Sequence, residues 1–589
     1  MSEFRPPVAD LTFALEHVVG YDEVAQLPGF EHADRDTVVE ILSEVGDFVA
    51  ELVAPTNRAG DLEGSRLNPD GTVTTPTGFK EAYAAFVEAG WGSVPLPEEF
   101  GGGGFPRSIG LAIQERTTTA NMAFALAPLL TQGAIEALLN YGTDEQKQQS
   151  LPKMVTGEWA GTMNLTEPHA GSDVGALTTK AVKRDDGTYA ISGQKIFITF
   201  GDHDLSEQIV HLVLARTPDA PAGTRGISCF IVPKFLVNDD GSLGERNGVH
   251  TVGVEHKMGI HGSPTCVLSY ENATGYLIGE ENIGMRIMFV MMNSARLSVG
   301  MQGLAVAERA YQQSLDYARE RTQGRAIGAT ETSPIIDFPD VRRMLMTQKA
   351  FIAALRRMML LNAVYVDIST HHPDAATRAR ADEIVGLLTP ICKSFGTDLG
   401  NELTSLALQI HGGMGFIEET GAAQHYRDVR IAAIYEGTNG IQALDLVGRK
   451  LPLNGGAAVR SYLEELRRTV DAVNAVNDPA FGWTGTRLAD AVDSLDRATE
   501  WLLGQIDKAP QAAFAGAAPY LRLFGSTAGG CMLADEALAA IRLANGDPAA
   551  RIALARFFAE NIAVQAPGLE RTVTEGADSV NAAGAALAG

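Results

Sequence analysis

Residues 180–200, KAVKRDDGTYAISGQKIFITF, decide the fold class of this chain. Two runs of alternating apolar and polar residues flank Asp186-Gly187, and an Asp-Gly pair between such runs is a strong β-hairpin signal. Further short apolar runs separated by Gly and Pro follow, among them QIVHLVLAR, GISCFIVPKF and TCVLSYENATGYLIG. The sequence therefore predicts a β-rich segment over about residues 161–285.

Helical periodicity surrounds this segment on both sides. In residues 37–53, TVVEILSEVGDFVAELV, apolar residues recur every three or four positions, and residues 116–142 predict a buried helix pair. Long helical runs return between residues 282 and 449, and LPLNGG (451–456) resembles a linker to an Ala- and Leu-rich helical module. We therefore expect five parts: an N-terminal extension that Pro6, Pro7 and Pro28 make irregular (1–35), an N-terminal helical domain (36–160), a middle β-domain (161–285), a C-terminal helical bundle (286–450) and an additional helical domain (451–589).

Composition excludes several classes of protein. The chain has 589 residues, 45% of them hydrophobic, so it can bury a sizeable core. Its 47 lysines and arginines against 72 aspartates and glutamates give a net charge of −25, which suits neither nucleic-acid phosphates nor an anionic membrane. The cysteines are far apart and form no C-x-x-C pair, so neither a disulfide framework nor a cysteine zinc site is expected.

No membrane segment, secretory signal or metal site is predicted. No stretch approaches about 18 consecutive apolar residues. The N-terminus, MSEFRPPVADLTF, has no basic start followed by an apolar run. His371-His372 lacks the spacing of metal ligands. These features predict a soluble, cytoplasmic protein of several domains that binds no nucleic acid and no membrane.

Two polar segments are candidates for a functional site. Residues 163–181, MNLTEPHAGSDVGALTTKA, offer backbone N–H groups and hydroxyls that could hold a ring system and phosphates, although an ordinary loop has the same composition. Residues 433–451, AIYEGTNGIQALDLVGRKL, place Glu436 just before a helix that Thr438 or Asn439 would cap. A carboxylate at a helix start is also typical of simple capping.

Seven motifs in this order resemble those of the acyl-CoA dehydrogenase family, over about residues 36–450. They are LPEEFGGGGF (96–105), YGTDEQKQQSLPKMVTGEWAGTMNLTEPHAGSD (141–173), GQKIFITFG (193–201), HKMGIHGSPTCVLSYENA (256–273), RERTQGR (319–325), QIHGGMGF (409–416) and YEGTNGIQ (435–442). The resemblance implies an α+β, mostly helical fold with an N-terminal helical domain, a β-barrel-like middle domain and a C-terminal four-helix bundle. The additional helical domain would follow the bundle.

The resemblance also implies FAD as cofactor, held between the β-domain and the bundle, with contacts from a second subunit of a homodimer. The matching flavin positions are Met163, Leu165, Thr166 and Ser172; Phe197 and Thr199; Arg321, Gln323 and the run from Gln409 through Gly412 and Gly413; and Thr438, Asn439 and Gly440. Phe197 stands where the family usually has Trp, and Gly440 where it more often has Gln.

Glu436 matches the catalytic base of the family. Branches that place the base elsewhere have a carboxylate just before the residue matching Arg296, where this chain has Ala295. The implied reaction removes the pro-R proton at C2 of an acyl-CoA thioester while a hydride passes from C3 to flavin N5, which yields the trans-2-enoyl-CoA. The positions that match substrate contacts are Ser172, Asn293, Arg296 and, one residue displaced, Arg449.

Length points to a large-subunit branch of the family, which acts on 3-methylmercaptopropionyl-CoA or on medium- and long-chain acyl-CoA. Electrons would pass to an electron-transfer flavoprotein, as in fatty-acid β-oxidation. An acyl-CoA oxidase, which uses O₂ instead, is the nearer alternative. A DNA-associated alkylation-response relative also has a C-terminal module, but residues 451–589 carry 11 lysines and arginines against 16 acidic residues, and DNA binding needs a basic face.

Overall fold

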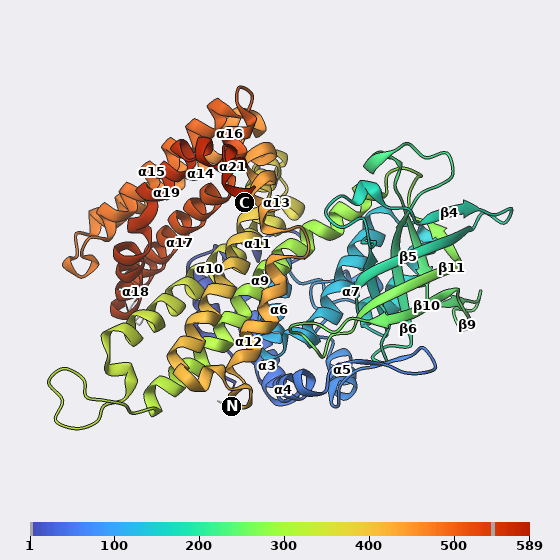
Figure 1. The fold of residues 1–589 in the computed structure, drawn as a ribbon, viewed down its shortest axis with the longest axis horizontal. Helices are drawn as coiled ribbons and strands as arrows, with labels where there is room; N and C mark the ends of the chain where they lie inside the picture. Colours follow the sequence, from blue (N-terminus) through green and yellow to red (C-terminus); the bar gives the residue numbers. More distant parts are fainter. Residues whose placement is uncertain (1–3, 544–547, 589) are drawn as a thin grey trace. The chain divides into compact units, whose positions relative to one another are not determined.

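The structure is a computed structural model that describes residues 4–543 and 548–588 (Figure 1). The chain divides into two compact units. The sheet unit joins residues 44–105 and 116–298, and the bundle unit joins residues 1–43, 106–115 and 299–589. Strands gather in the sheet unit and long helices in the bundle unit, in the order that the sequence predicted.

The sheet unit contains a seven-stranded sheet in which the strand order is β3-β6-β7-β11-β5-β4 and β10 pairs with β11. Its strands are β3 Trp159–Asn164, β4 Lys180–Lys183, β5 Tyr189–Thr199, β6 Gln208–Ala215, β7 Ser228–Pro233, β10 Val249–Val254 and β11 Thr265–Leu277. β4 and β5 pair antiparallel on either side of Asp186-Gly187, so the predicted hairpin is confirmed. β3 and β6 pair parallel.

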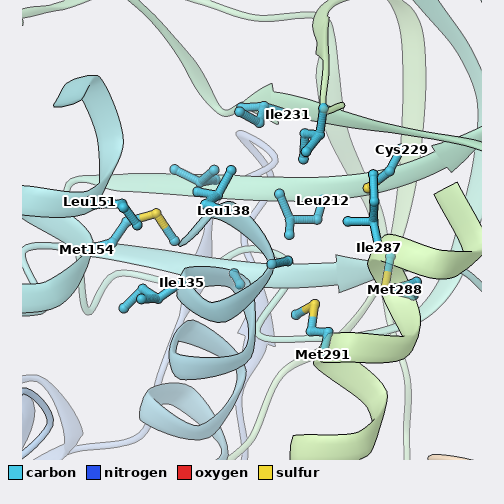
Figure 2. Packing of buried hydrophobic residues seen from close by; sticks show 14 of the residues in the cluster. Ile135, Leu138, Leu151, Met154, Leu212, Cys229, Ile231, Ile287, Met288 and Met291 are labelled. Atoms are coloured by element: carbon cyan, nitrogen blue, oxygen red, sulfur yellow. The ribbon is translucent and has the colours of Figure 1, made fainter. Parts of the chain in front are cut away.

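Two helices, α7 Met122–Tyr141 and α8 Asp144–Thr156, pack on the sheet and complete its core. α4 Ala54–Glu63 and α5 Phe79–Glu88 contact α7. Figure 2 shows apolar side chains of α7, α8, β6, β7 and the start of α9 (Gly284–Glu320) meeting in one cluster. Its labelled members are Ile135, Leu138, Leu151, Met154, Leu212, Cys229, Ile231, Ile287, Met288 and Met291.

The predicted buried helix pair is confirmed as α6 (Arg107–Ala120) and α7. Asn121 separates them, because its Oδ1 accepts a hydrogen bond from the Phe124 N–H at 3.1 Å and so caps α7. Within the described chain, α7 is the one helix long and apolar enough to cross a membrane by length and composition. Of its apolar window 78% is buried in the structure, as in a core helix.

The bundle unit is built on α9, α10 (Pro339–His371), α11 (Ala375–His411) and the shorter α12 (Ala422–Val429). Glycines let α9 and α11 approach closely: a Cβ on Gly303 would lie 2.2 Å from the carbonyl oxygen of Gly396. A Cβ on Gly400 would lie 2.8 Å from the Cα of Gly303. Any larger residue at these two positions would push the helices apart.

The additional C-terminal residues form a helical module in the bundle unit. Its main helices are α14 Ala457–Val476, α15 Thr484–Gln505, α17 Ala517–Arg542, α18 Pro548–Asn561 and α19 Ala566–Glu575. A buried ion pair between Arg357 of α10 and Glu536 of α17 joins the module to the bundle. The module is therefore packed on α10 and is not a freely tethered appendage.

The expectation of an irregular N-terminal extension is wrong for the described part of residues 1–35. Helices α1 (Val8–His17) and α2 (Tyr21–Val24) form there, and both pack on α10. Pro7 stands just before α1, where a proline does not interrupt a helix. The buried face of α1 consists of Leu11, Ala14 and Leu15. Tertiary packing of this face stabilises a helix in a segment where the prolines predicted irregular structure. Residues 1–3 lie outside the described range.

Asp367 of α10 caps α6 from a distance in sequence. Its carboxylate accepts hydrogen bonds from the backbone N–H groups of Arg107 at 2.6 Å and Ser108 at 3.0 Å. Burial raises the pKa of Asp367 from 3.8 to about 6, although these donors favour the charged form. Since the two N–H groups are at the start of α6, this carboxyl group couples α6 to α10.

Asp367 should make the stability of the protein depend on pH. Because its folded-state pKa lies above 3.8, the folded chain binds more protons than the unfolded chain between about pH 4 and 6. The contribution of Asp367 is complete below about pH 3 and is lost as the pH rises from about 4 through 6. Relative to Asp367→Asn, the unfolding free energy of the wild type should fall by about 2 kcal/mol between pH 4 and 7. Urea denaturation across this range measures the difference, and a constant difference would contradict the prediction.

Candidate active site

Glu436 lies in a strained turn that leads into α13 (Asn439–Asp445) of the bundle unit. Its φ is 55° and that of Gly437 is 83°, so two successive residues are left-handed. A non-glycine residue held in this region costs about 1–3 kcal/mol and is concentrated at functional sites. Thr438 begins the helix as its N-cap, with Oγ1 accepting a hydrogen bond from the Ile441 N–H at 3.3 Å. Of the two caps that the sequence allowed, the structure selects Thr438.

Asn439 fastens the start of α13 to α11. Its Oδ1 accepts a hydrogen bond from Nζ of the buried Lys393 at 2.8 Å. Its Nδ2 donates to the carboxylate of Asp398 at 2.7 Å and to Thr397 Oγ1 at 3.0 Å. The Asn439 side chain is thus committed to α11, which leaves its backbone for contact with a ligand.

Tyr435 anchors the other side of the turn. Its hydroxyl donates a hydrogen bond to Oε1 of Gln302, a fully buried residue of α9. Burial, together with the neighbouring Glu436 carboxylate, raises the pKa of Tyr435 far above its ordinary value. The phenol therefore stays neutral at physiological pH and cannot act as a competing base.

A polar cavity of about 660 Å³ opens beside this turn. It is lined by Asp398, Asn401, Glu402, Ser405, Tyr426, Arg430, Ala433, Ile434, Thr438, Asn439 and Gly440. Oδ1 of Asn401 is buried and accepts no hydrogen bond from the described residues, while its Nδ2 donates to the Thr397 carbonyl at 2.8 Å. The cavity therefore offers carboxylate acceptors and the guanidinium of Arg430 to a polar ligand.

In the sheet unit, a β-bulge turns Phe197 out of β5. The pairing of β5 with β11 shifts between Ile198 and Lys195, and Phe197 has a φ of 59°. Strict alternation would place Lys195 and Phe197 on one face. Instead Lys195 is fully buried and Phe197 is 59% exposed. The bulge redirects the aromatic side chain, a common role of bulges next to active sites.

A buried ion pair holds this bulge against the segment 163–172. Nζ of Lys195 donates to Glu167 Oε1 at 2.8 Å and to the Leu165 carbonyl at 3.0 Å. Burial lowers the pKa of Lys195 to about 8 against the attraction of Glu167. Burial alone would raise the pKa of Glu167, but Lys195 and donors from Thr178 and Thr179 hold it at about 2. The Ile196 N–H also donates to the Thr166 carbonyl at 2.9 Å, so the two predicted flavin segments form one platform.

The remaining predicted residues of the sheet unit differ in exposure. Met163, Leu165, Thr166 and Thr199 are half-buried, whereas Ser172 and Asn293 are exposed. Arg296 is buried and its Nη1 lies 3.4 Å from Asn293 Oδ1, which brings these two predicted CoA contacts together.

The predicted partner-facing residues of the bundle unit are exposed. Arg321 and Gln323 hydrogen-bond to each other at 3.3 Å. Gln409, Gly412 and Gly413 lie at the exposed end of α11. Arg449 is 62% exposed in its side chain, pairs with Asp445 at 2.6 Å and lies in the π-helical turn Leu446–Lys450.

Sequence reasoning missed the residues that support the site. Lys393 was detectable as a lone charge in the apolar run TPICKSFG of α11, and Lys195 as a charge within a predicted strand. Gln442 is the last residue of the motif YEGTNGIQ (435–442), which predicts no role for its side chain. In the described chain no group of three or more His, Cys, Asp or Glu residues is arranged to hold a metal ion.

Comparisons with known proteins agree with this architecture. Models of the acyl-CoA dehydrogenase N-terminal, middle and C-terminal domains match residues 36–158, 162–273 and 282–451. A model described as acetyl-CoA dehydrogenase C-terminal like matches residues 462–583. The chain belongs to the acyl-CoA dehydrogenase family. The predicted fold class, including the additional helical domain, is confirmed, and the protein is an oxidoreductase of this family.

Relatives match this acyl-CoA dehydrogenase over nearly its whole length. A 3-methylmercaptopropionyl-CoA dehydrogenase from Ruegeria pomeroyi is 47% identical over 98% of this chain and 99% of its own. A broad-specificity linear acyl-CoA dehydrogenase from Mycobacterium tuberculosis is 35% identical, covering 95% and 96%. The structure of an acyl-CoA dehydrogenase complexed with FAD from Bacillus anthracis, 22% identical, superposes with a TM-score of 0.75 over 96% of this chain and 92% of that one.

The Lys195–Glu167 pair should be necessary for stability of the sheet unit. Lys195→Met leaves the Glu167 carboxylate buried without its cation, so the unfolding free energy should fall by about 3–5 kcal/mol. Lys180→Met, which removes an exposed lysine of β4, should change it by less than about 0.5 kcal/mol. Urea denaturation measures both, and equal effects of the two variants would refute the role of the pair.

Proposed function

We propose that this chain oxidises an acyl-CoA thioester to the trans-2-enoyl-CoA, with FAD as cofactor and Glu436 as base. The observation that carries the proposal is the turn at Glu436. Glu436 has a left-handed backbone conformation just before a helix. Its neighbours Tyr435 and Asn439 are hydrogen-bonded to buried side chains, which fixes the turn on both sides. Strain of this kind is retained where function requires a fixed geometry.

Residues of the sheet unit fit a flavin ring. Phe197 presents an exposed aromatic face, on which a planar ring system can stack. Thr199 and the segment containing Met163, Leu165, Thr166 and Ser172 would complete the contacts. Phe197 carries no indole N–H, so it would contribute stacking without the hydrogen bond of a tryptophan.

Residues of the bundle unit fit the nucleotide part of FAD. Thr438, Asn439 and Gly440 line the cavity of about 660 Å³. Its carboxylates, Asp398 and Glu402, can accept hydrogen bonds from ribose hydroxyls or an amino group. Because Gly440 has no side chain, it leaves space in the cavity where it lines it.

In the reaction, Glu436 takes the proton from C2 of the acyl group. FAD, when bound, supplies the acceptor for the hydride that leaves C3. Tyr435 stays protonated, so Glu436 alone of this neighbouring pair serves as base. Ser172, Asn293 and Arg296 would orient the thioester and its CoA end, and Arg449 is a further candidate for that role.

The substrate that we propose is 3-methylmercaptopropionyl-CoA. The support is the 47% identical relative, which carries that substrate in its name and aligns over the whole chain, additional module included. A range of linear acyl-CoA thioesters is the second candidate, because the broad-specificity relative also aligns over both the catalytic domains and the module.

We further propose a cytoplasmic homodimer that passes electrons to an electron-transfer flavoprotein, with no role in binding DNA or membranes. The exposed Arg321, Gln323 and Gln409–Gly413 would reach the FAD of the second subunit. The four cysteines are buried free thiols, which is compatible with a reducing compartment. An oxidase would instead produce peroxide during turnover.

Glu436→Gln should bind FAD and fold like the wild type but fail to reduce the flavin. The amide retains the size of the side chain and cannot take the C2 proton, so we expect bleaching by acyl-CoA to slow by at least about 10³-fold. Anaerobic stopped-flow absorbance measures the rate. Glu51→Gln, at an exposed glutamate, is the matched control and should bleach normally; bleaching of Glu436→Gln at that rate would remove Glu436 from the role.

A panel of thioesters should identify the substrate and the acceptor. Anaerobic titration with 3-methylmercaptopropionyl-CoA should bleach the flavin at lower concentration than butyryl-, octanoyl- or palmitoyl-CoA. Comparable bleaching by all linear thioesters would favour the second candidate, a broad specificity for linear acyl-CoA. Turnover in air with stoichiometric peroxide would favour the oxidase.

A further inference from the structure

We propose that Gln442 is the positioning residue that holds Glu436 in its left-handed conformation. The inference rests on the proposed role of Glu436 as base and assigns a task to a side chain that touches neither flavin nor substrate in that proposal. Gln442 is in the second turn of α13, six residues after Glu436, and is fully buried.

One amide group of Gln442 binds both peptide units that follow Glu436. Its Nε2 lies 3.3 Å from the carbonyl oxygen of Glu436 and 3.3 Å from that of Gly437. A side-chain amide has two N–H donors, so it can serve both acceptors at once. The two successive peptide planes are therefore tied to a single rigid group, and their orientations cannot change independently.

The position of the same amide and the left-handed φ of Gly437 together favour glycine at position 437. A Cβ on Gly437 would lie 2.7 Å from Nε2 of Gln442, and the φ of 83° is itself unfavourable for other residues. Gln442 and Gly437 thus form a matched pair: the glycine gives the space and the backbone freedom, and the glutamine selects one conformation from that freedom.

The hydrogen bonds of Tyr435 and Asn439 fix the two ends of the turn, so Glu436 and Gly437 between them are the part that needs a further restraint. Tyr435 is bound to Gln302 on one side, and Asn439 is bound to Lys393 and Asp398 of α11 on the other. A return of Glu436 to negative φ would rotate its Cβ by more than about 100° relative to the preceding peptide. The carboxylate would then leave the position that the anchors define.

Simple packing does not explain a glutamine at this site. The side-chain oxygen Oε1 of Gln442 is buried and accepts no hydrogen bond from the described residues. An unsatisfied buried acceptor destabilises the fold. A methionine of similar size would fill the space without that cost, so the benefit of glutamine lies in its two donated hydrogen bonds to the turn.

The experiment compares Gln442→Met with Gln348→Met in the full-length holoenzyme. Gln348 is a fully buried glutamine of α10 that hydrogen-bonds Ser314 and the Met344 carbonyl, and it lies outside the proposed catalytic and binding residues. We expect Gln442→Met to retain FAD and an unchanged KM but to bleach at least about 10-fold more slowly, since small misplacement of a reacting group is costly. Gln348→Met should bleach within about two-fold of the wild type.

Hydrogen–deuterium exchange of the unliganded proteins gives a readout that does not depend on activity. The amides of residues 441 and 442 donate to Oγ1 and to the carbonyl oxygen of Thr438, so their protection depends on the order of the turn. They should exchange at least about 10-fold faster in Gln442→Met than in the wild type and Gln348→Met. Unchanged exchange would overturn the inference about Gln442, whatever the bleaching results. Failure of every thioester to bleach the wild type would instead refute the proposed function. Faster exchange with wild-type bleaching would also overturn it, because Gln442 would then restrain the turn without serving the base.

Discussion

The buried amino group of Lys393 underlies the arrangement of the candidate active site. Lys393 of α11 is fully buried, and its Nζ donates to the side chain of Asn439 at the first position of α13. A hydrogen-bond donor removed from water needs an acceptor nearby, so the start of α13 is fixed where it can supply one. The Glu436 turn extends from this fixed point, and the close approach of α9 and α11 brings Gln302 to its other end.

The sheet unit likewise combines backbone strain with a buried lysine. Phe197, like Glu436, is a non-glycine residue with positive φ, and a β-bulge exposes its side chain. The buried Lys195 beside it binds Glu167 and the backbone of the adjoining segment. Each unit therefore presents one candidate site residue, Glu436 or Phe197, from a locally unfavourable backbone. In each, a buried lysine supports the neighbouring chain.

The additional module explains the length of this family member in structural terms. α17 contacts α10 and α13, so the module packs on helices of the bundle, including the one that follows the Glu436 turn. The buried pair Arg357–Glu536 crosses this interface, and Phe13 of α1 receives the Arg551 guanidinium of α18 at 3.7 Å from its ring centre. The N-terminal helices and the module are thus parts of the same packed unit.

The sequence by itself determined the order of helices and strands, the hairpin at Asp186-Gly187, the family and the candidate base. These depend on periodicity, turn chemistry and motif order, which are properties of neighbouring residues. Only the tertiary structure decided which side chains support the site. Lys393 and Asn439 are 46 residues apart, and no period links them. The outward turn of Phe197 depends on pairing with β11, and α1 forms because α10 covers its apolar face, so local pattern predicted neither.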